Sequence, residues 1–124
     1  MIQIETTSHD PFFNQAFEDY VFRTYREGDV LLLWRNRPAV VVGCYQNICR
    51  EVHVRALLDR GIPVVRRMSG GGTVYHDLGN LNYTLISDQT GPLDYDRCLE
   101  PVIRALNALG IPAQKNRTCD IAVD

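Results

Sequence analysis

The segment RRMSGGGTVYHDLGN, from Arg66 to Asn80, decides the fold and the candidate site. It joins the apolar run IPVVRR, at 62–67, to a second strand-like run through a serine and three consecutive glycines. Glycine loses more conformational freedom on folding than other residues, so three together need a structural reason. One interpretation of residues 69–73 is a flexible turn between strands. The other is a concave anion site, in which bare backbone N–H groups and a bidentate arginine hold phosphate oxygens.

The neighbours of the glycines favour the anion site. Arg66 and Arg67 end the preceding strand-like run, and Ser69 adds a hydroxyl group. The segment is not a Walker A loop, which needs GxxxxGK[ST], and it is not a GxGxxG fingerprint that opens a helix. Any nucleotide would therefore be held by a different kind of loop.

The spacing of apolar residues predicts a sheet covered by helices. Strands are expected at 1–6, 30–34, 39–43 and 62–67, twice within 73–87 with a bend at Leu78-Gly79, and at 111–116 and 119–124. Helices are expected at 8–28, 51–61 and 93–110. Several neighbouring strands have the spacing of hairpins, and the helices have to cover sheet faces. The fold class is therefore α/β in the α+β sense, with a mixed, largely antiparallel sheet flanked by helices.

The two long helices carry start and stop signals and one apolar face each. Asp10 suits an N-cap, Pro11 suits the first turn, and Gly28 and Gly110 follow the helix ends. The residues expected to be buried recur at helical spacing. They are Phe13, Ala16, Phe17, Tyr20 and Val21 in the first helix, and Leu99, Val102, Ile103, Leu106 and Leu109 in the second.

Size and composition narrow the class of protein. The 124 residues, 45% hydrophobic and 23% charged, suit one globular domain. A net charge of −2 argues against a nucleic-acid or membrane partner, and no apolar run approaches the roughly 20 residues of a membrane span. With no signal-peptide pattern, the expected location is cytoplasmic. The four cysteines lack zinc-ligand spacing, which favours reduced thiols.

Four blocks of the sequence, taken together and in this order, resemble lipoate-protein ligases. The blocks are DPFFNQAFEDYVF, LLLWRNRPAVVVGCYQN, VVRRMSGGGTVYHDLGNLNYT, and ALNALGIPA with DIAVD. This family shares its fold superfamily with biotin-protein ligases and octanoyltransferases. The resemblance implies a two-step reaction: lipoate and ATP form lipoyl-AMP and pyrophosphate, and the acyl group then passes to a lysine of a lipoyl domain. Octanoate is the alternative acid.

The resemblance also implies roles for residues of the glycine segment. Arg67 would bind nucleotide phosphate, and His76 would lie beside the acyl-adenylate, although a structural histidine at a strand end is an equal reading. The residues expected to line the nucleotide or shape its pocket are Arg66, Ser69, Gly70, Gly71, Gly72, Thr73, Val74, Tyr75, Asp77 and Asn80, with Asn82 as a further candidate. Asp120 is either a Mg²⁺-facing carboxylate or a surface acid at a strand end.

An acyl chain needs an apolar pocket. Burying about eight methylene equivalents at ~0.8 kcal/mol each gives at most ~6 kcal/mol of attraction. Trp34, Val40, Val42 and Tyr45 either line such a tunnel or belong to the core.

The sequence departs from the family near its end. The family carries a lysine in a KxSG-like segment shortly after the strand that matches CDIAVD, whereas Lys115 is too early and Asp124 is the last residue. Cys119 stands where many members have asparagine. Residues 1–124 are therefore expected to be the N-terminal part of a catalytic domain whose small C-terminal accessory domain is absent, and to show little adenylation alone. A second polypeptide would then supply the lysine.

Two other functions stay open. An octanoyltransferase moves an acyl chain through a thioester without ATP, and Cys44 is the thiol to consider for that chemistry. The chain would otherwise be a non-catalytic module that contributes half a site and binds a partner chain carrying the lysine.

Overall fold

The computed structural model describes residues 1–87, 91–92, 94–118 and 120–123. Backbone contacts divide the chain into two compact units, Met1–Asp88 and Gln89–Asp124. Each unit is described by itself below.

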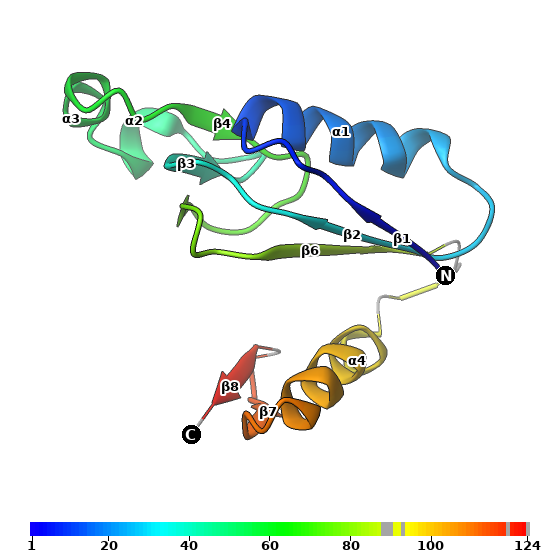
Figure 1. The fold of residues 1–124 in the computed structure, drawn as a ribbon. Coiled ribbons are helices and arrows are strands. Elements are labelled where there is room, and N and C mark those ends of the chain that lie inside the picture. Colours follow the sequence, from blue (N-terminus) through cyan, green and yellow to red (C-terminus); the bar gives the residue numbers. More distant parts are fainter. Residues whose placement is uncertain (88–90, 93, 119, 124) are drawn as a thin grey trace. The chain divides into compact units, whose positions relative to one another are not determined.

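The first sheet of the first unit is built around a parallel pair of strands. Strand β1 (Ile2–Glu5) pairs in parallel with β2 (Val30–Trp34), and helix α1 (Pro11–Thr24) makes the crossover that a parallel pair requires. Strand β6 (Asn82–Ile86) pairs with the other edge of β2 in antiparallel fashion, which gives the order β1-β2-β6. Helix α1 lies along one face of this sheet (Figure 1).

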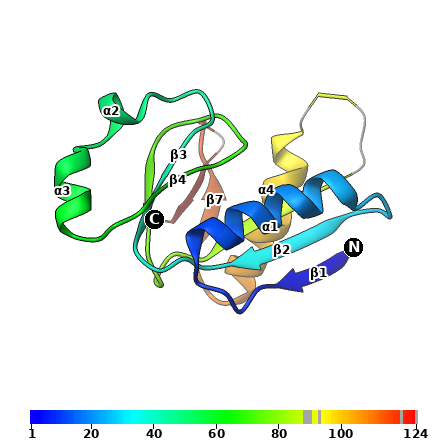
Figure 2. The same ribbon diagram turned by 90° about the horizontal axis from the view of Figure 1, so that it is seen from above.

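The second sheet repeats this plan with shorter elements. Strand β3 (Ala39–Val42) pairs in parallel with β4 (Val64–Arg66), and two short helices, α2 (Ile48–Glu51) and α3 (Val54–Asp59), lie in the connection. Figure 2 shows these helices beside the β3–β4 pair. Strand β5 (Val74–His76) pairs with β3 in antiparallel fashion. The glycine segment thus connects β4 to β5, the two outer strands of this sheet.

The expected fold class is confirmed, although the pairing of neighbours is not. Three of the five described strand pairings are antiparallel, and both sheets of the first unit are mixed. The hairpin-like spacing of β2 and β3, and of β5 and β6, was misleading because the members of each pair belong to different sheets. The chain leaves one sheet at residues 35–38 and returns to it at 77–81, so these short segments form the junction between the sheets.

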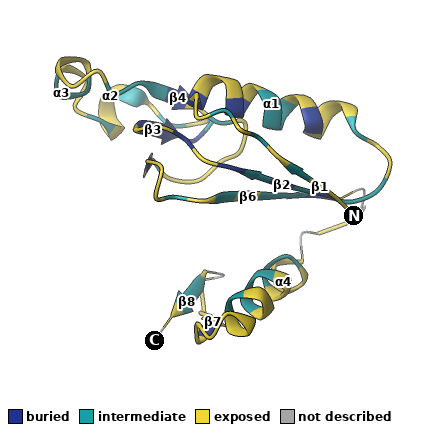
Figure 3. Ribbon diagram, viewed as in Figure 1, coloured by how far each residue is buried: buried dark blue, intermediate teal, exposed yellow. Residues whose placement is uncertain are grey.

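Helix α1 buries only part of the face expected: Val21 is buried and Phe17 is partly buried as predicted. Its N-cap is Asp10, whose carboxylate accepts from the N–H of Phe12 at 3.0 Å, and Pro11 opens the helix as predicted. However, Phe13 and Tyr20 are 50% and 62% exposed, whereas the polar Asn14 is 1% exposed. The buried residues of the helix are Pro11, Asn14, Gln15 and Val21. In Figure 3 the ribbon of α1 therefore alternates between buried and exposed segments.

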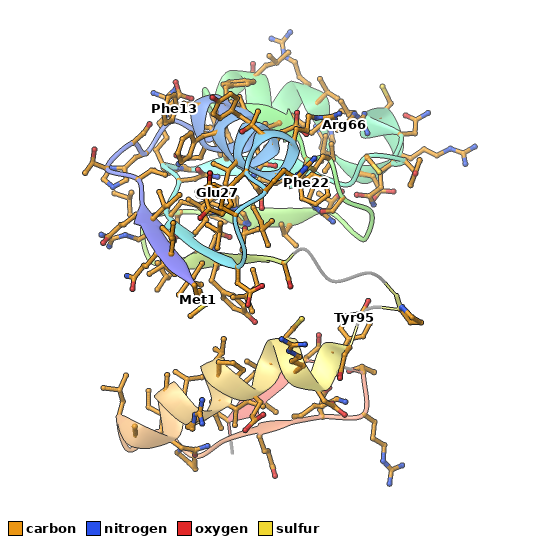
Figure 4. All side chains as sticks on the ribbon, turned by 90° about the vertical axis from the view of Figure 1, so that its right-hand side faces the viewer. Met1, Phe13, Phe22, Glu27, Arg66 and Tyr95 are labelled. Atoms are coloured by element: carbon orange, nitrogen blue, oxygen red, sulfur yellow. The ribbon has the colours of Figure 1, made fainter. Side chains whose placement is uncertain are left out.

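The polar face of α1 is explained by what it meets. Val21 packs with Val30 and Ile86, with Phe17 partly buried against them, so one end of the helix covers apolar strand residues. The other end lies over the junction between the sheets, where backbone carbonyls and polar side chains have to be paired. Phe13 and Phe22, labelled on α1 in Figure 4, are left half exposed.

The second unit consists of one helix and a strand pair. Helix α4 (Tyr95–Ala108) contacts β7 (Ala113–Lys115), and β7 pairs in antiparallel fashion with β8 (Ile121–Val123). The expected helix and both strands are confirmed. Four of the predicted apolar residues of α4 are half-buried, whereas Leu109 is 77% exposed at the C-cap. Among the described residues, no helix has the length and apolar character to cross a membrane.

Candidate functional site

A pocket of about 200 Å³ opens beside the glycine segment. Helix α1, strands β2, β3, β5 and β6, and the start of the glycine segment contribute to its wall. The lining residues are Gln15, Glu18, Trp34, Val41, Arg67, Ser69, Val74, His76, Asn82, Tyr83 and Thr84. A second hollow of about 240 Å³ lies on the other side of Trp34 and contains no residue of the glycine segment. The pocket beside the glycines is therefore the one that combines apolar walls with the residues predicted to bind phosphate.

Arg67 holds the glycine segment by its carbonyl oxygens. Its guanidinium donates to Gly70 O through Nε at 3.1 Å and Nη2 at 2.7 Å, to Gly72 O through Nη2 at 2.7 Å, and to Val41 O through Nη1 at 3.3 Å. Hydrogen bonds from a charged donor stabilise by about 1.5–3 kcal/mol each. Arg67 therefore fixes the position of the loop from within, which the sequence did not predict.

The amide groups of the loop are left available by this arrangement. Within the described part of the chain, no group accepts a hydrogen bond from the N–H of Gly70, Gly71 or Gly72. The carbonyls of Gly70 and Gly72 accept from Arg67, and that of Gly71 faces Gly43. Consecutive free N–H groups of this kind make a concavity that suits an anion. The interpretation of residues 69–73 as an anion site thus fits the geometry.

Two glycines are required by the local structure. Gly71 has φ of +92°, and a Cβ there would lie 2.9 Å from Arg67 Nη2. Gly43, at the end of β3, faces the same loop, and a Cβ on it would lie 2.3 Å from the carbonyl oxygen of Gly71. Gly70 and Gly72 have open space around the Cβ position. The close approach of strand end and loop therefore depends on Gly43 and Gly71.

The outer side of the glycine segment is tied to residues 43–46. Arg66 donates through Nη1 to the carbonyls of Gly43, Cys44 and Gln46 at 2.8, 3.2 and 2.8 Å. The side-chain oxygen of Gln46 accepts from Gly43 N and from the hydroxyl of Thr73, both at 2.8 Å. Cys44 N also donates to the carbonyl of Ser69 at 2.9 Å. These contacts make the two loops one rigid unit.

The pocket wall opposite the glycines combines an aromatic ring with a buried carboxyl group. Thr84 accepts from Trp34 Nε1 at 3.4 Å and donates to Glu18 Oε1 at 2.5 Å. Burial raises the pKa of Glu18, and this outweighs the lowering by the Thr84 hydrogen bond and by Arg67. Gln15 Oε1 is buried without a hydrogen-bond partner among the described groups. The pocket wall therefore combines many polar groups with an apolar part that includes Trp34 and Val41.

His76 lies at the polar end of the pocket. It is 8% exposed, and its ring centroid is 5.8 Å from that of Trp34. Burial and, to a lesser extent, the positive charge of Arg67 lower the pKa of His76. Its Nδ1 lies 3.2 Å from the side-chain nitrogen of Asn36. The neutral form of His76 is therefore favoured at neutral pH.

The structure brings some of the predicted site residues together and separates others. Arg67, Ser69, Val74, His76 and Asn82 line the pocket. The others are placed on the loop or beyond it: Arg66, Gly70, Gly71, Gly72, Thr73, Tyr75, Asp77 and Asn80.

Asp77 and Asn80 belong to the turn after β5. Asp77 Oδ1 accepts from Gly79 N at 2.8 Å, and Asn80 N donates to Asp77 O at 3.1 Å, which is an Asx-type turn. Asn80 Nδ2 donates to Asn82 Oδ1 at 3.0 Å. Their observed contacts shape the bend at 78–79, and their predicted contact with the nucleotide stays a prediction.

The residues considered for an acyl tunnel fall into three groups. Trp34 lines the pocket, as predicted for a residue of the acyl tunnel. Val40 and Val42 are buried and do not line the pocket, whereas Val41, on the opposite face of β3, does. Tyr45 is 94% exposed and belongs neither to the core nor to the pocket wall, so both readings of this residue were wrong.

Asp120 lies in the second unit, at the turn before β8. Its Oδ2 accepts from Thr118 Oγ1 at 2.7 Å and from Asn116 Nδ2 at 3.3 Å, and these hydrogen bonds lower its pKa. Within the described residues, no three His, Cys, Asp or Glu side chains are grouped to hold a metal ion. Asp120 is thus an exposed carboxylate held by its own turn. Because Mg²⁺ bound to phosphates takes only one or two carboxylates, the predicted contact of Asp120 with such an ion stays a prediction.

The cysteines considered for chemistry are also placed. Cys44 is a free thiol of intermediate exposure, and it is not among the residues that line the pocket. Cys49 and Cys98 are free as well. The substitution at Cys119 lies outside the described residues.

The sequence did not identify several residues of the site, because their roles depend on contacts with distant parts of the chain. Gln15 and Glu18 stand three residues apart on α1, among aromatic residues that were expected to face inward. Their spacing is helical, and polar residues at i and i+3 within an aromatic helix were the available signal. Thr84 and Asn36 gave no signal in isolation, since their partners come from distant parts of the chain.

Comparison with known proteins agrees with the fold and shows the family. The family described as the lipoyl protein ligase A/B catalytic domain matches residues 10–124, and the chain belongs to this family. Lipoate-protein ligase LplJ of Bacillus subtilis is 41% identical over 119 residues, which cover 94% of this chain and 36% of LplJ. The mitochondrial lipoyl amidotransferase LIPT1 of Mus musculus is 39% identical over 127 residues, which cover 98% and 33%. The chain thus spans about a third of the length of these relatives.

Solved structures of ligases share this architecture. The structure of P. falciparum LipL1 in complex with lipoate has a TM-score of 0.91 and 26% sequence identity to this chain. The match covers 99% of this chain and 40% of the LipL1 chain. Lipoate-protein ligase A bound with ATP matches 99% and 51% with a TM-score of 0.83 at 27% identity. A bipartite lipoate protein ligase of Thermoplasma acidophilum, described with its E2 lipoyl domain, matches 98% and 50% with a TM-score of 0.84 at 26% identity.

Proposed function

We propose that this chain forms the acyl-adenylate site of a lipoate-protein ligase. The reaction joins the carboxylate of lipoate to the α-phosphate of ATP with loss of pyrophosphate, and the acyl group then passes to a lysine of a lipoyl domain. The observation that carries the proposal is that free loop amides lie next to a pocket with an apolar part. Gly70, Gly71 and Gly72 present N–H groups, and the pocket wall contains Trp34 and Val41.

The chemistry needs these two halves next to each other. A carboxylate is a poor electrophile, so it has to acquire a leaving group, and charge then moves onto pyrophosphate. Preorganised N–H groups stabilise that charge, because they are already oriented before the reaction. Arg67 contributes by holding the loop carbonyls away from the anion and by adding a positive charge. The guanidinium group of Arg67 has five N–H donors, and the contacts to Val41 O, Gly70 O and Gly72 O use four of them. One N–H on Nη1 is left to donate to an anion.

The pocket wall accounts for the choice of an acyl chain. Trp34 and Val41 bury methylene groups, each worth about 0.8 kcal/mol. The ligase and amidotransferase relatives, the lipoate complex and the ATP complex support lipoate and ATP as substrates. Mg²⁺ would accompany ATP, since Mg²⁺ is commonly held by substrate phosphates.

We also propose that the cation which neutralises the acyl carboxylate comes from outside residues 1–124. Carboxylate and phosphate repel each other strongly in a dry site, and a lysine supplied by the rest of the protein or by a second polypeptide would offset this. The bipartite organisation described for the Thermoplasma ligase supports the second possibility. Residues 1–124 would then be the N-terminal part of the catalytic domain.

One alternative has a specific observation in its favour. The name of the mouse relative, lipoyl amidotransferase, describes transfer, and an acyltransferase of that kind would not need ATP. A thioester route through Cys44 is not favoured, because this thiol does not line the pocket.

Isotope exchange between pyrophosphate and ATP separates these functions. The intact protein should catalyse exchange only when lipoate is present, since exchange requires reversible adenylation. Acyl transfer to a lipoyl domain without any such exchange would contradict the ligase and support the transferase.

A further inference from the structure

A chain of buried amide side chains leads from α1 to His76. We infer that Asn14 and Asn36 are positioning residues that hold His76 as the neutral tautomer with its proton on Nε2. His76 then presents a hydrogen-bond donor, and not a base, to the pocket. The use of this donor on an acyl-adenylate oxygen rests on the proposed function, whereas the tautomer itself does not.

The orientation of Asn14 follows from backbone carbonyls. Its Nδ2 lies 3.0 Å from the carbonyl oxygens of Ser8 and of Arg35, and carbonyl oxygens can only accept. The opposite amide orientation would place Oδ1 against both of them. Oδ1 instead accepts from the hydroxyl of Thr6 at 2.8 Å. At 1% exposure Asn14 has no water to offset a wrong orientation.

The orientation of Asn36 follows from that of Asn14. Asn14 Nδ2 also lies 2.9 Å from Asn36 Oδ1, so its two hydrogens are shared among three oxygens. The reverse orientation of Asn36 would set two amide nitrogens, neither of which can accept, against each other. The amide nitrogen of Asn36 is thereby directed at His76 Nδ1, 3.2 Å away. Asn36 is 0% exposed, so water cannot offset the reverse orientation.

The tautomer of His76 follows from the orientation of Asn36. An amide N–H directed at Nδ1 requires a lone pair there, so in the neutral ring the proton lies on Nε2. A proton on Nδ1 would face the Asn36 amide hydrogens at 3.2 Å. Among the described residues, no protein group is a hydrogen-bond partner of Nε2, although His76 lines the pocket. The donor is therefore free for a ligand.

The charged groups around His76 agree with a neutral ring. Arg67 approaches from the end of β4 and disfavours a second positive charge. Glu18, from α1, lines the same pocket, and burial raises its pKa. Trp34 contributes an apolar ring on the β2 side.

The test is nitrogen NMR of the intact protein with ¹⁵N-labelled histidine. The His76 signals are assigned by their loss in His76→Gln. The wild-type protein at pH 7 should show an unprotonated Nδ1 and a protonated Nε2. Asn36→Asp replaces the donor with an isosteric acceptor, so the proton should move to Nδ1 and the pKa of His76 should rise. Asn47→Asp is the matched control, because Asn47 is an exposed N-cap whose oxygen accepts from Cys49 N at 3.0 Å, and an aspartate keeps this role.

A merely structural role would not move the tautomer. In Asn36→Asp we also expect kcat for lipoate-dependent exchange to fall about 100-fold with little change in KM for ATP, which is typical for the loss of one preorganised donor. A wild-type His76 that is cationic or carries its proton on Nδ1 would overturn the inference, even if Asn36→Asp does not fold. Failure of a lipoyl-adenylate analogue to bind would count against the proposed function and leave the tautomer result standing.

Discussion

Gly43 provides the sharpest test of how the glycine segment is held. Replacement by alanine places a Cβ 2.3 Å from the carbonyl oxygen of Gly71, whereas ordinary contact begins at 3.4 Å. The loop would have to retreat by about 1 Å, and overpacking of this kind costs about 1–3 kcal/mol. A shift of this size breaks the hydrogen bond from Cys44 N to Ser69 O and those around Gln46. We therefore expect a lower free energy of unfolding and weaker lipoate-dependent exchange.

Gly70→Ala is the matched control for Gly43→Ala. The Cβ position of Gly70 has no atom within 4 Å, and its φ is not positive. Alanine there should keep or raise the free energy of unfolding, by up to about 1 kcal/mol, because it restricts the unfolded chain. Urea unfolding of the intact protein measures both variants. Equal stabilities for the two would refute the close approach of Gly43 to the loop.

Three further predictions concern Arg67, Glu18 and Gly71. Arg67→Lys should reduce pyrophosphate exchange about 100-fold, because one ammonium nitrogen cannot reach the carbonyls that Nε, Nη1 and Nη2 of Arg67 meet, and a loop displaced by 1 Å costs about this much. Arg55→Lys, in an exposed ion pair, is the control and should leave the rate unchanged. Equal rates for the two variants would refute the role of Arg67 in holding the loop. Glu18→Gln should stabilise the protein at pH 7. Burial raises the pKa of Glu18, so the protonated carboxyl group contributes to the free energy of unfolding at low pH, and this contribution is lost as the pH rises through the folded-state pKa. The gain measured by urea unfolding should shrink toward pH 4, and a gain that grows on acidification would contradict this sign. Gly71→Ala should lower the free energy of unfolding by about 1–3 kcal/mol, because φ is +92° and the new Cβ meets Arg67; an unchanged unfolding midpoint would show that the loop adopts another conformation.

The features that could be predicted from the sequence are local ones. Asp10 and Pro11 start α1, and Gly61 and Gly110 adopt positive φ at helix ends, because each choice depends on a few neighbouring residues. The glycine segment was also recognised, because its motif is contiguous.

The features that were missed depend on distant partners. Helical spacing correctly predicted the burial of Val21 but not the exposure of Phe13 and Tyr20. Asn14 is buried instead, because carbonyls from residues 8 and 35 compensate its amide group. The sequence did not predict the observed partners of Arg67, which are the carbonyls of Gly70 and Gly72 in its own loop and of Val41 on β3. Its contact with phosphate stays a prediction. Tyr45 is an aromatic residue next to an apolar strand, as expected for a pocket, but its side chain is exposed to solvent. Spacing along the chain does not encode which side of a loop faces which group.

The most direct measurement is a crystal structure of the intact protein with a lipoyl-adenylate analogue in which a sulfamoyl group replaces the phosphate. We expect the sulfamoyl oxygens to accept from the N–H groups of Gly70 to Gly72, and the acyl chain to lie against Trp34 and Val41. An analogue bound in another cavity, or a loop that turns its carbonyls toward the ligand, would contradict the account.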